Sequence, residues 1–296
     1  MNIGWIEKFD ISGKIADRGL TELIGVRSED CVLIDPTEEG ENCTETPIIL
    51  SSGGSILIDK VFPHIFPDNA IECKLWGFGV CFSTIVGQIS DRYHDSPYLQ
   101  RLQQPVGVRD EFTQSVLKEC KIESSMVGFT AYHIPFIQYH RKGYVVFSPT
   151  ASMPKEDQIQ LRRYIEIDNG KPIILVSHDE AVDDLAVSLK ESKLIDDFVS
   201  SEADLDEIIA AYVSADGVYT GKCQAAALAA SHGVPVCFYV DNVVNVRYHG
   251  IRSIGIPAIS LSGASQPHLH YANRRLVENL KMNMISYADS FKDAFS

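Results

Sequence analysis

The chain has 296 residues, of which 45% are hydrophobic and 22% are charged. This composition excludes a disordered or fibrous protein and is typical of a globular chain with two domains. The 26 Lys and Arg residues against 40 Asp and Glu residues give a formal net charge of −14, which disfavours nucleic acid and anionic membrane surfaces as partners. A small anionic ligand is still compatible with this charge, because a local group of cations can oppose the overall potential.

The sequence contains no signal for a membrane span or for secretion. No run approaches the roughly 18 apolar residues that a transmembrane helix needs, and Glu7 and Asp10 interrupt the N-terminal stretch where a secretion signal would be apolar. We therefore expect a cytoplasmic protein with no transmembrane segment. The seven cysteines are scattered without a CxxC pair, and the histidines lack metal-ligand spacing, so we expect buried free thiols and neither a metal nor another cofactor.

Short apolar runs alternate with amphipathic stretches along nearly the whole chain. Strands are expected at residues 31–35, 47–51, 72–80, 106–108, 143–148, 172–177, 217–219 and 235–240. Helices are expected at residues 15–24, 55–65, 111–120, 155–168, 180–191, 205–213 and 222–232, with a long one within residues 267–295. This alternation predicts an α/β protein whose parallel sheets are covered by helices on both faces.

The pattern is interrupted about half-way along the chain. Residues 133–143 show no helical or strand period, and a new apolar run begins at Tyr144. We expect a Rossmann-like N-terminal domain over residues 1–140, a second Rossmann-like domain over residues 141–266, and a C-terminal helix over residues 267–296 that packs near the domain junction. Doubly wound domains of this kind bind ligands at the carboxyl ends of their strands, in the cleft between the domains.

Two glycine-containing segments follow expected strands in the first half. Gly53, Gly54 and Ser55 lie between the run PIILS and a stretch with a helical pattern. Their backbone N–H groups can approach an anion at a helix N-terminus, or the segment is a tight turn in which Ser55 is the N-cap. The second segment, residues 77–79, is an incomplete dinucleotide fingerprint because Phe82 stands where the third glycine would be. We expect a close approach of two backbones there instead.

Charged residues follow two other expected strands. Arg109 and Asp110 come after VGV, and His178 and Asp179 come after PIILV. Each aspartate is placed to cap the following helix. Arg109 can hold a carboxylate or phosphate in the cleft, or it can pair with Asp110 alone. His178 can face the cleft as an acid, a base or a hydrogen-bond donor.

The most informative segment is GVYTGKCQAAALAASHGVP, a strand that runs into an Ala-rich helix. Lys222 and Gln224 lie in the first turn of this helix. A cation at the positive end of a helix is unfavourable by itself, so Lys222 indicates an anionic ligand opposite it. The alternative is a surface ion pair between Lys222 and a nearby carboxylate such as Asp216.

In their order and spacing these segments resemble the polysaccharide pyruvyltransferase family. The resemblance is carried, in chain order, by IILSSGGSI, KLWGFGV, VGVRDEFTQSVLKECKI, PIILVSHDE, AYVSADGVYTGKCQAAALAASHGVPV and SIGIPAI. It implies a glycosyltransferase-B-like fold, with two Rossmann-type domains and an interdomain cleft.

The most characteristic motif of that family is Arg-Leu-His, followed by an Ala-rich helix and Gly-x-Pro. Here the Gly-Val-Pro after the helix sets the register, which puts Lys222, Cys223 and Gln224 on the three positions. Lys222 keeps the cation, whereas the amide of Gln224 cannot transfer a proton. The family's early Asn-x-Gly-Asp motif is poorly kept, and its nearest match is the segment at residues 13–17.

The resemblance implies a transferase that moves a pyruvyl group from phosphoenolpyruvate to a saccharide acceptor, free or lipid-linked, in cell-surface polysaccharide biosynthesis. Arg109 and Lys222 would hold the anionic donor, Gly53, Gly54, Ser55 and Gln224 would add hydrogen bonds, and His178 would carry the proton. Two alternatives stay open. One is a nucleotide-sugar glycosyltransferase of the same two-domain plan, and the other is a catalytically altered relative that binds a glycan or an anion without turnover.

Overall fold

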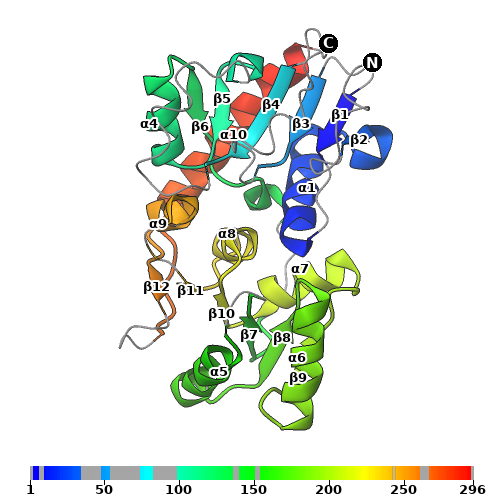
Figure 1. Ribbon diagram of the computed structural model, residues 1–296, viewed down its shortest axis with the longest axis vertical. Helices are drawn as coiled ribbons and strands as arrows, with labels where there is room; N and C mark the ends of the chain where they lie inside the picture. Colours follow the sequence, from blue (N-terminus) through cyan, green and yellow to red (C-terminus); the bar gives the residue numbers. More distant parts are fainter. Residues whose placement is uncertain are drawn as a thin grey trace.

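The computed structural model describes residues 3–6, 10–34, 48–53, 74–82, 99–135, 140–150, 154–241, 243, 245–260 and 267–294. These residues form two parallel sheets of six strands each, one above the other in Figure 1. All strands of the first sheet precede all strands of the second in the chain. The molecule therefore has an N-terminal and a C-terminal Rossmann-like domain, as the alternating pattern predicted.

The N-terminal sheet has the strand order β2-β1-β3-β4-β5-β6, and every neighbouring pair is parallel. Its strands are β1 (Ile3–Ile6), β2 (Val32–Ile34), β3 (Ile48–Ser51), β4 (Lys74–Val80), β5 (Val106–Val108) and β6 (Ser124–Met126). β3 is buried along its whole length and β4 along all but Lys74, which is the burial that continuous apolar runs predict. The helix expected at residues 55–65 lies outside the described residues.

The C-terminal sheet has the order β12-β11-β10-β7-β8-β9, again with every neighbouring pair parallel. Its strands are β7 (Val145–Ser148), β8 (Ile173–Val176), β9 (Asp197–Val199), β10 (Gly217–Thr220), β11 (Val236–Val240) and β12 (Ala258–Ser260). The two edge strands, β9 and β12, were not expected. Each has only three residues, too few to show a period.

Helices connect the strands, and two of them follow the aspartates that the sequence marks as caps. They are α1 (Ile11–Ile24), α4 (Glu111–Glu119), α5 (Lys155–Asn169), α6 (Glu180–Glu191), α7 (Leu205–Ser214), α8 (Cys223–Ser231), α9 (His249–Ser253) and α10 (Arg274–Asp293). The Asp110 carboxylate accepts from the Thr113 N–H at 2.7 Å, and Asp179 accepts from Val182 at 3.1 Å. Both predicted caps are confirmed. Within the described residues no helix is both long and apolar enough to cross a membrane.

The two domains share one apolar core at their junction. In Figure 1, α1 and the short 3-10 helix η3 (Thr130–His133) of the N-terminal domain face α7 and α8 of the C-terminal domain. Ile15 and Tyr132 belong to the same buried cluster as Tyr212 and the alanines of α8. Because alanine side chains are small, helices can pack closely against α8, which brings the N-termini of α1 and α8 to the same region.

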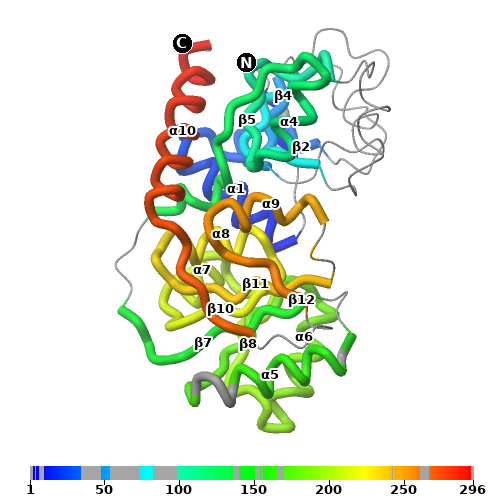
Figure 2. Tube along the Cα trace, turned by 90° about the vertical axis from the view of Figure 1, so that its left-hand side faces the viewer, coloured from blue at the N-terminus to red at the C-terminus, as the bar shows by residue number. Residues whose placement is uncertain are grey.

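The last helix, α10, returns from the C-terminal domain to the N-terminal one. Figure 2 shows it running along the outside of the molecule to the C-terminus. The Phe291 ring lies 5.1 Å from the Trp76 ring and 5.8 Å from the Phe78 ring, in edge-to-face contacts. α10 begins at Arg274 because the chain before it is extended, and His270 exchanges backbone hydrogen bonds with Val236 there.

Candidate functional site

A pocket of about 190 Å³ lies between the two domains. The N-terminal domain lines it with Asp10, Ser12, Gly13, Ala16, Gly53 and Arg109, and the C-terminal domain lines it with Lys222, Cys223, Gln224 and Arg247. Most of these residues follow the carboxyl end of a parallel strand, where open α/β sheets bind ligands. The structure therefore brings together four of the residues that the sequence singled out: Gly53, Arg109, Lys222 and Gln224. Gly54 and Ser55 lie outside the described residues.

Two helix N-termini border the pocket, one from each domain. α1 begins after Asp10, whose Oδ1 accepts from the Gly13 N–H at 2.7 Å. α8 begins after Lys222, which makes no side-chain capping bond. The first intrahelical bond of α8 is donated by Ala226 to the Lys222 carbonyl, so the preceding N–H groups of the helix have no intrahelical acceptor. Such N–H groups, together with the helix dipole, favour an anion.

Arg109 is 4% exposed and reaches across the domain boundary. Its Nη2 donates to the Arg247 carbonyl at 2.7 Å, and its guanidinium lies 5.1 Å from the centre of the Phe129 ring. Its Nε lies 4.0 Å from Asp110 Oδ2 and has no hydrogen-bond partner among the described residues. Asp110 caps α4 through Oδ1, and its Oδ2, which accepts no hydrogen bond among the described residues, forms a buried ion pair with Arg109. Arg109 is therefore held by Asp110 and by the Arg247 carbonyl, and its Nε makes no hydrogen bond among the described residues.

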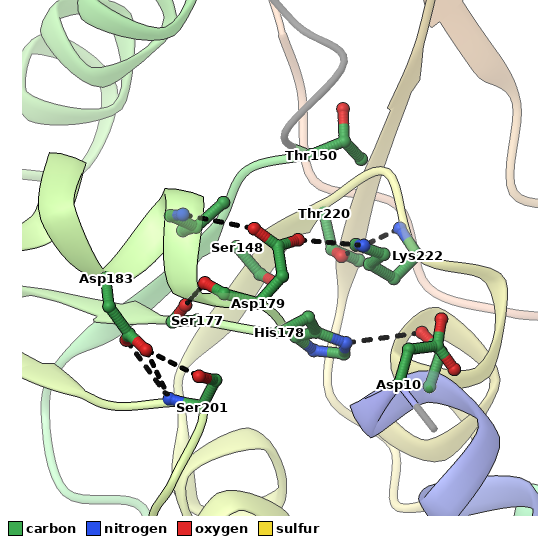
Figure 3. Close-up of polar contacts among 12 residues, drawn as sticks. Asp10, Ser148, Thr150, Ser177, His178, Asp179, Asp183, Ser201, Thr220 and Lys222 are labelled. Atoms are coloured by element: carbon green, nitrogen blue, oxygen red, sulfur yellow. Dashed lines mark hydrogen bonds and ion pairs between the residues drawn. The ribbon is translucent and has the colours of Figure 1, made fainter. Parts of the chain in front are cut away.

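Lys222 is the N-cap residue of α8, and Gln224 lies in its first turn. Lys222 Nζ lies 3.7 Å from Asp179 Oδ2, a contact that Figure 3 marks with a dashed line. Lys222 thus does pair with a nearby carboxylate, but the partner is Asp179 and not Asp216, which Lys171 Nζ contacts at 2.5 Å. Gln224 is 6% exposed, and its Oε1 has no hydrogen-bond partner among the described residues. The first turn of α8 thus offers a cation, free N–H groups and an amide to one ligand.

His178 lies behind the pocket wall rather than in it. The residue is 2% exposed, and Figure 3 shows its ring pointing from the end of β8 toward the first turn of α1. Nδ1 lies 3.2 Å from the Ser12 hydroxyl, and Nε2 lies 2.7 Å from the Tyr212 hydroxyl. Burial, assisted by the nearby charge of Lys222, lowers the pKa of His178 to about 3. The imidazole is therefore neutral near pH 7, and among the described residues Ser12 is its hydrogen-bond partner at the pocket.

The glycines at the ends of β3 and β4 serve close backbone contacts. Gly53 has φ +103°, and a Cβ on it would lie 2.8 Å from the Gly79 carbonyl oxygen. Gly79 has φ +78°, and a Cβ there would lie 2.3 Å from the Gly128 carbonyl oxygen. The close approach expected at residues 77–79 is confirmed, and Gly53 brings backbone to the pocket where no side chain fits.

Sequence reasoning missed three charged or polar residues of the pocket: Asp10, Ser12 and Arg247. The first two follow β1, a strand of four residues, IGWI, that is too short and glycine-interrupted to show a pattern. A signal existed at Asp10, which precedes an amphipathic helix as a capping aspartate does. Arg247 lies in the short 3-10 helix η4 (Val246–Tyr248), where no periodic pattern marks it.

No protein-family model matches the chain, and no curated protein matches its sequence. Solved structures match over nearly the whole length. S. aureus MnaA, in a co-structure with UDP, gives a TM-score of 0.58 at 12% identity over 96% of this chain and 91% of that one. UDP-GlcNAc 2-epimerase from Methanocaldococcus jannaschii, in complex with UDP-GlcNAc and UDP, gives 0.56 at 11% identity over 96% and 93%. The same enzyme from Neisseria meningitidis, bound to UDP-GlcNAc, gives 0.53 at 9% identity over 99% of both chains.

The fold is glycosyltransferase-B-like. At these identities the likeness establishes the fold alone, because one fold hosts many activities. In this chain the glycosyltransferase-B-like arrangement joins two helix N-termini and three cationic side chains, Arg109, Lys222 and Arg247, around one pocket. What the pocket binds has to be argued from those groups.

Proposed function

We propose that the chain is an enzyme of nucleotide sugars, which binds a nucleoside diphosphate sugar in the interdomain pocket and acts at the bond between sugar and diphosphate. One observation carries the proposal. A protein with a formal net charge of −14 concentrates Arg109, Lys222 and Arg247 at the N-termini of α1 and α8. Among the described residues that line the pocket, only Asp10 is acidic, while Asp110 and Asp179 lie within 4.0 Å of Arg109 and Lys222 outside the lining. This is a site for an anion with more than one charge.

In the proposed complex, the first turn of α8 holds the diphosphate. The N–H groups of Cys223 and Gln224 face one phosphate, and Lys222 and Arg247 neutralise the charge that grows on the diphosphate as the bond to the sugar breaks. Arg109, whose Nη2 is anchored on the Arg247 carbonyl, offers its free Nε from the N-terminal domain. Glycosyl transfer to a saccharide hydroxyl is the reaction that we put first, since it needs such charge stabilisation at the leaving group.

The structural comparisons support the nucleotide-sugar reading in a general way. S. aureus MnaA was solved with UDP, and the M. jannaschii enzyme was solved with UDP-GlcNAc and UDP. Both share the two-domain arrangement over most of their length.

Pyruvyl transfer from phosphoenolpyruvate is the second candidate. The same cations can hold a phosphate and a carboxylate, and the free Nε of the buried Arg109 suits a carboxylate. This chemistry also needs an acid that protonates the methylene carbon. His178 is neutral and lies behind Ser12, and Gln224 carries no transferable proton. The pocket therefore favours a donor whose reaction depends on charge stabilisation.

Calorimetric titration with UDP, UDP-GlcNAc, phosphoenolpyruvate and inorganic phosphate tests the proposal. We expect UDP and UDP-GlcNAc to bind at least tenfold more tightly than phosphoenolpyruvate and inorganic phosphate, a difference of about 1.4 kcal/mol. Tighter binding of phosphoenolpyruvate would support the second candidate. If none of the four binds, the pocket is not an anionic-donor site and the proposal fails.

A pair of variants separates the site from the general effect of charge. Arg247→Ala removes a cation from the pocket, and Arg275→Ala removes one from an exposed position of α10. Both change the net charge equally, so any long-range contribution to UDP affinity is the same. We expect at least a tenfold loss of UDP affinity in Arg247→Ala and less than a twofold change in Arg275→Ala.

A further inference from the structure

A chain of four hydrogen-bonding side chains leads from the pocket into the C-terminal domain. Ser12, which lines the pocket at the start of α1, lies 3.2 Å from His178 Nδ1. His178 Nε2 lies 2.7 Å from the Tyr212 hydroxyl, and that hydroxyl is hydrogen-bonded to Ser148 Oγ at 2.8 Å. Ser12 belongs to the N-terminal domain and the other three to the C-terminal domain. This chain of hydrogen bonds therefore forms only when the two domains are in contact.

All four groups are uncharged, and each can both donate and accept a hydrogen bond. Burial and Lys222 keep the imidazole neutral, because they lower the pKa of His178 to about 3. A neutral imidazole carries one N–H and one acceptor nitrogen, and either nitrogen can play either part. A hydroxyl can rotate to do the same. The four hydrogen-bonding groups can therefore donate in either direction along the series without moving any net charge into the core.

The distances allow either direction. In one direction the Tyr212 hydroxyl donates to Ser148, and its oxygen accepts from His178 Nε2–H. Nδ1 is then the acceptor for the Ser12 hydroxyl, and the Ser12 oxygen presents lone pairs to the pocket. In the opposite direction, Ser148 donates to Tyr212, Tyr212 donates to Nε2, and Nδ1–H donates to Ser12. The Ser12 hydroxyl is then free to donate into the pocket.

We infer that Ser12 is a ligand-binding hydroxyl whose direction is set by His178, Tyr212 and Ser148 as positioning residues. A phosphate oxygen in the pocket can only accept, so binding of a nucleoside diphosphate selects the direction in which Ser12 donates. A ligand hydroxyl can donate, so it is compatible with the direction in which Ser12 donates to His178. The inference rests on the proposed function, because it needs a phosphate group in this pocket. It adds to that function a switch between the two neutral tautomers of His178, in a hydrogen-bond network that includes residues of both domains.

The tautomer of His178 reports the direction directly. Nitrogen NMR of protein labelled with ¹⁵N-histidine distinguishes Nδ1–H from Nε2–H, and the resonance of His178 is identified by its loss in His178→Gln. We expect saturating UDP to raise the share of the Nδ1–H form relative to the free protein. The same tautomer in both states, with UDP bound by calorimetry, would overturn the inference and leave the proposed function intact. Failure of UDP and inorganic pyrophosphate to bind at all overturns both.

Two tyrosines give a matched pair for the role of the chain. Tyr212→Phe removes the link between His178 and Ser148, whereas Tyr239→Phe removes a buried hydroxyl that donates to the Ser148 carbonyl at 2.5 Å. Both lose one buried hydroxyl next to the same serine. We expect the UDP-dependent change of tautomer to vanish in Tyr212→Phe and to persist in Tyr239→Phe. If the UDP-dependent change of tautomer is the same in both variants, the hydrogen bond between His178 and Tyr212 does not set the direction of the Ser12 hydroxyl.

Substitution of Ser12 tests the hydroxyl that meets the ligand. We expect Ser12→Ala to weaken UDP binding about tenfold, and Ser12→Thr, which keeps a hydroxyl, to restore the affinity to within about threefold of the original protein. Ser12 lies in the first turn of α1, so urea unfolding of both variants checks that the helix is intact. Unchanged UDP affinity in a folded Ser12→Ala protein shows that the hydroxyl does not contact the ligand.

Discussion

Lys222 occupies the N-terminal end of α8, where the helix dipole repels a cation. The cost of this placement is about 0.3–1 kcal/mol for an exposed side chain. The ion pair with Asp179, at 3.7 Å between partly exposed groups, stabilises the fold by about the same amount. The two contributions to stability nearly cancel, so the lysine is not explained by the stability of the fold. Binding of an anionic ligand in the adjacent pocket is a better explanation for a lysine at this position.

We therefore expect Lys222→Ala to leave the free energy of unfolding unchanged to within about 0.5 kcal/mol and to weaken UDP binding at least tenfold, about 1.4 kcal/mol. Urea unfolding and calorimetric titration measure the two effects. Lys171→Ala is the control, because Lys171 forms a closer ion pair with Asp216 and does not line the pocket. Equal UDP affinities in the original protein and Lys222→Ala would remove this lysine from the site.

His178 makes the free energy of unfolding depend on pH. The pKa of its imidazole is about 3 in the folded protein, against 6.5 in the absence of burial. Between these values the unfolded chain binds a proton that the folded protein does not bind. The contribution of neutral His178 to the free energy of unfolding is therefore fully present above about pH 6.5. It falls by about 1.4 kcal/mol per pH unit as the pH drops toward 3.

In His178→Gln this dependence is absent, because an amide does not titrate. We expect the free energy of unfolding to fall by about 2 kcal/mol more in the original protein than in His178→Gln when the pH is lowered from about 6.5 to about 4.5. Urea unfolding at several pH values gives the two curves. His133, whose pKa burial lowers to about 4, is present in both proteins and cancels in the difference. Parallel curves would mean that His178 is protonated in the folded state.

α1 is positioned against η3 by a contact that only glycine permits. A Cβ at Gly19 would lie 2.1 Å from the Thr130 carbonyl oxygen, and backbone atoms there cannot rotate away. Alanine would favour the helix by about 1 kcal/mol on propensity alone. Displacement of the helix from η3 costs about 1–3 kcal/mol and moves Asp10 and Ser12 with it.

Gly19→Ala is thus expected to lower the free energy of unfolding by up to about 2 kcal/mol and to weaken UDP binding, although Gly19 does not line the pocket. Lys14→Ala on the exposed side of the same helix serves as the comparison and should change stability by less than about 0.5 kcal/mol. Urea unfolding and titration are the measurements. A stabilised Gly19→Ala protein would show that η3 yields to the added methyl group.

The chain is organised so that its last helix packs on its first domain. α10 follows the C-terminal sheet, yet Tyr287 and Phe291 pack on Trp76 and Phe78 of the N-terminal one. Phe291 is 3% exposed. Near its start the same helix contributes Val277 to the core at the domain junction. Loosening α10 should therefore affect the pairing of the domains as well as the N-terminal sheet.

For Phe291→Ala we expect a loss of about 3–5 kcal/mol in the free energy of unfolding, because the ring is removed from a closed aromatic cluster. Met282→Ala, at an α10 position that is 60% exposed, should cost less than about 0.5 kcal/mol. Urea unfolding followed by tryptophan fluorescence detects the change, since Trp76 touches Phe291. Similar losses in the two variants would contradict the packing.

The sequence alone predicted the α/β class, two Rossmann-like domains, and four residues that line one pocket. It could do so because local patterns carry this information: apolar runs such as YVVFS mark buried parallel strands, and Asp110 and Asp179 mark helix starts. The carboxyl ends of parallel strands lie at one edge of a sheet. Residues such as Arg109 and Lys222 could therefore be placed near a common cleft before any distance was known.

Only the tertiary structure assigned the partners of those residues. Lys222 contacts Asp179 instead of Asp216, Arg109 reaches the Arg247 carbonyl, and His178 lies behind Ser12. Each of these contacts joins segments more than 40 residues apart in sequence, and all but the first cross the domain boundary. Local pattern places a residue on its own strand or helix. How two domains pack, and so which side chains meet between them, depends on the shape of both packed surfaces at once.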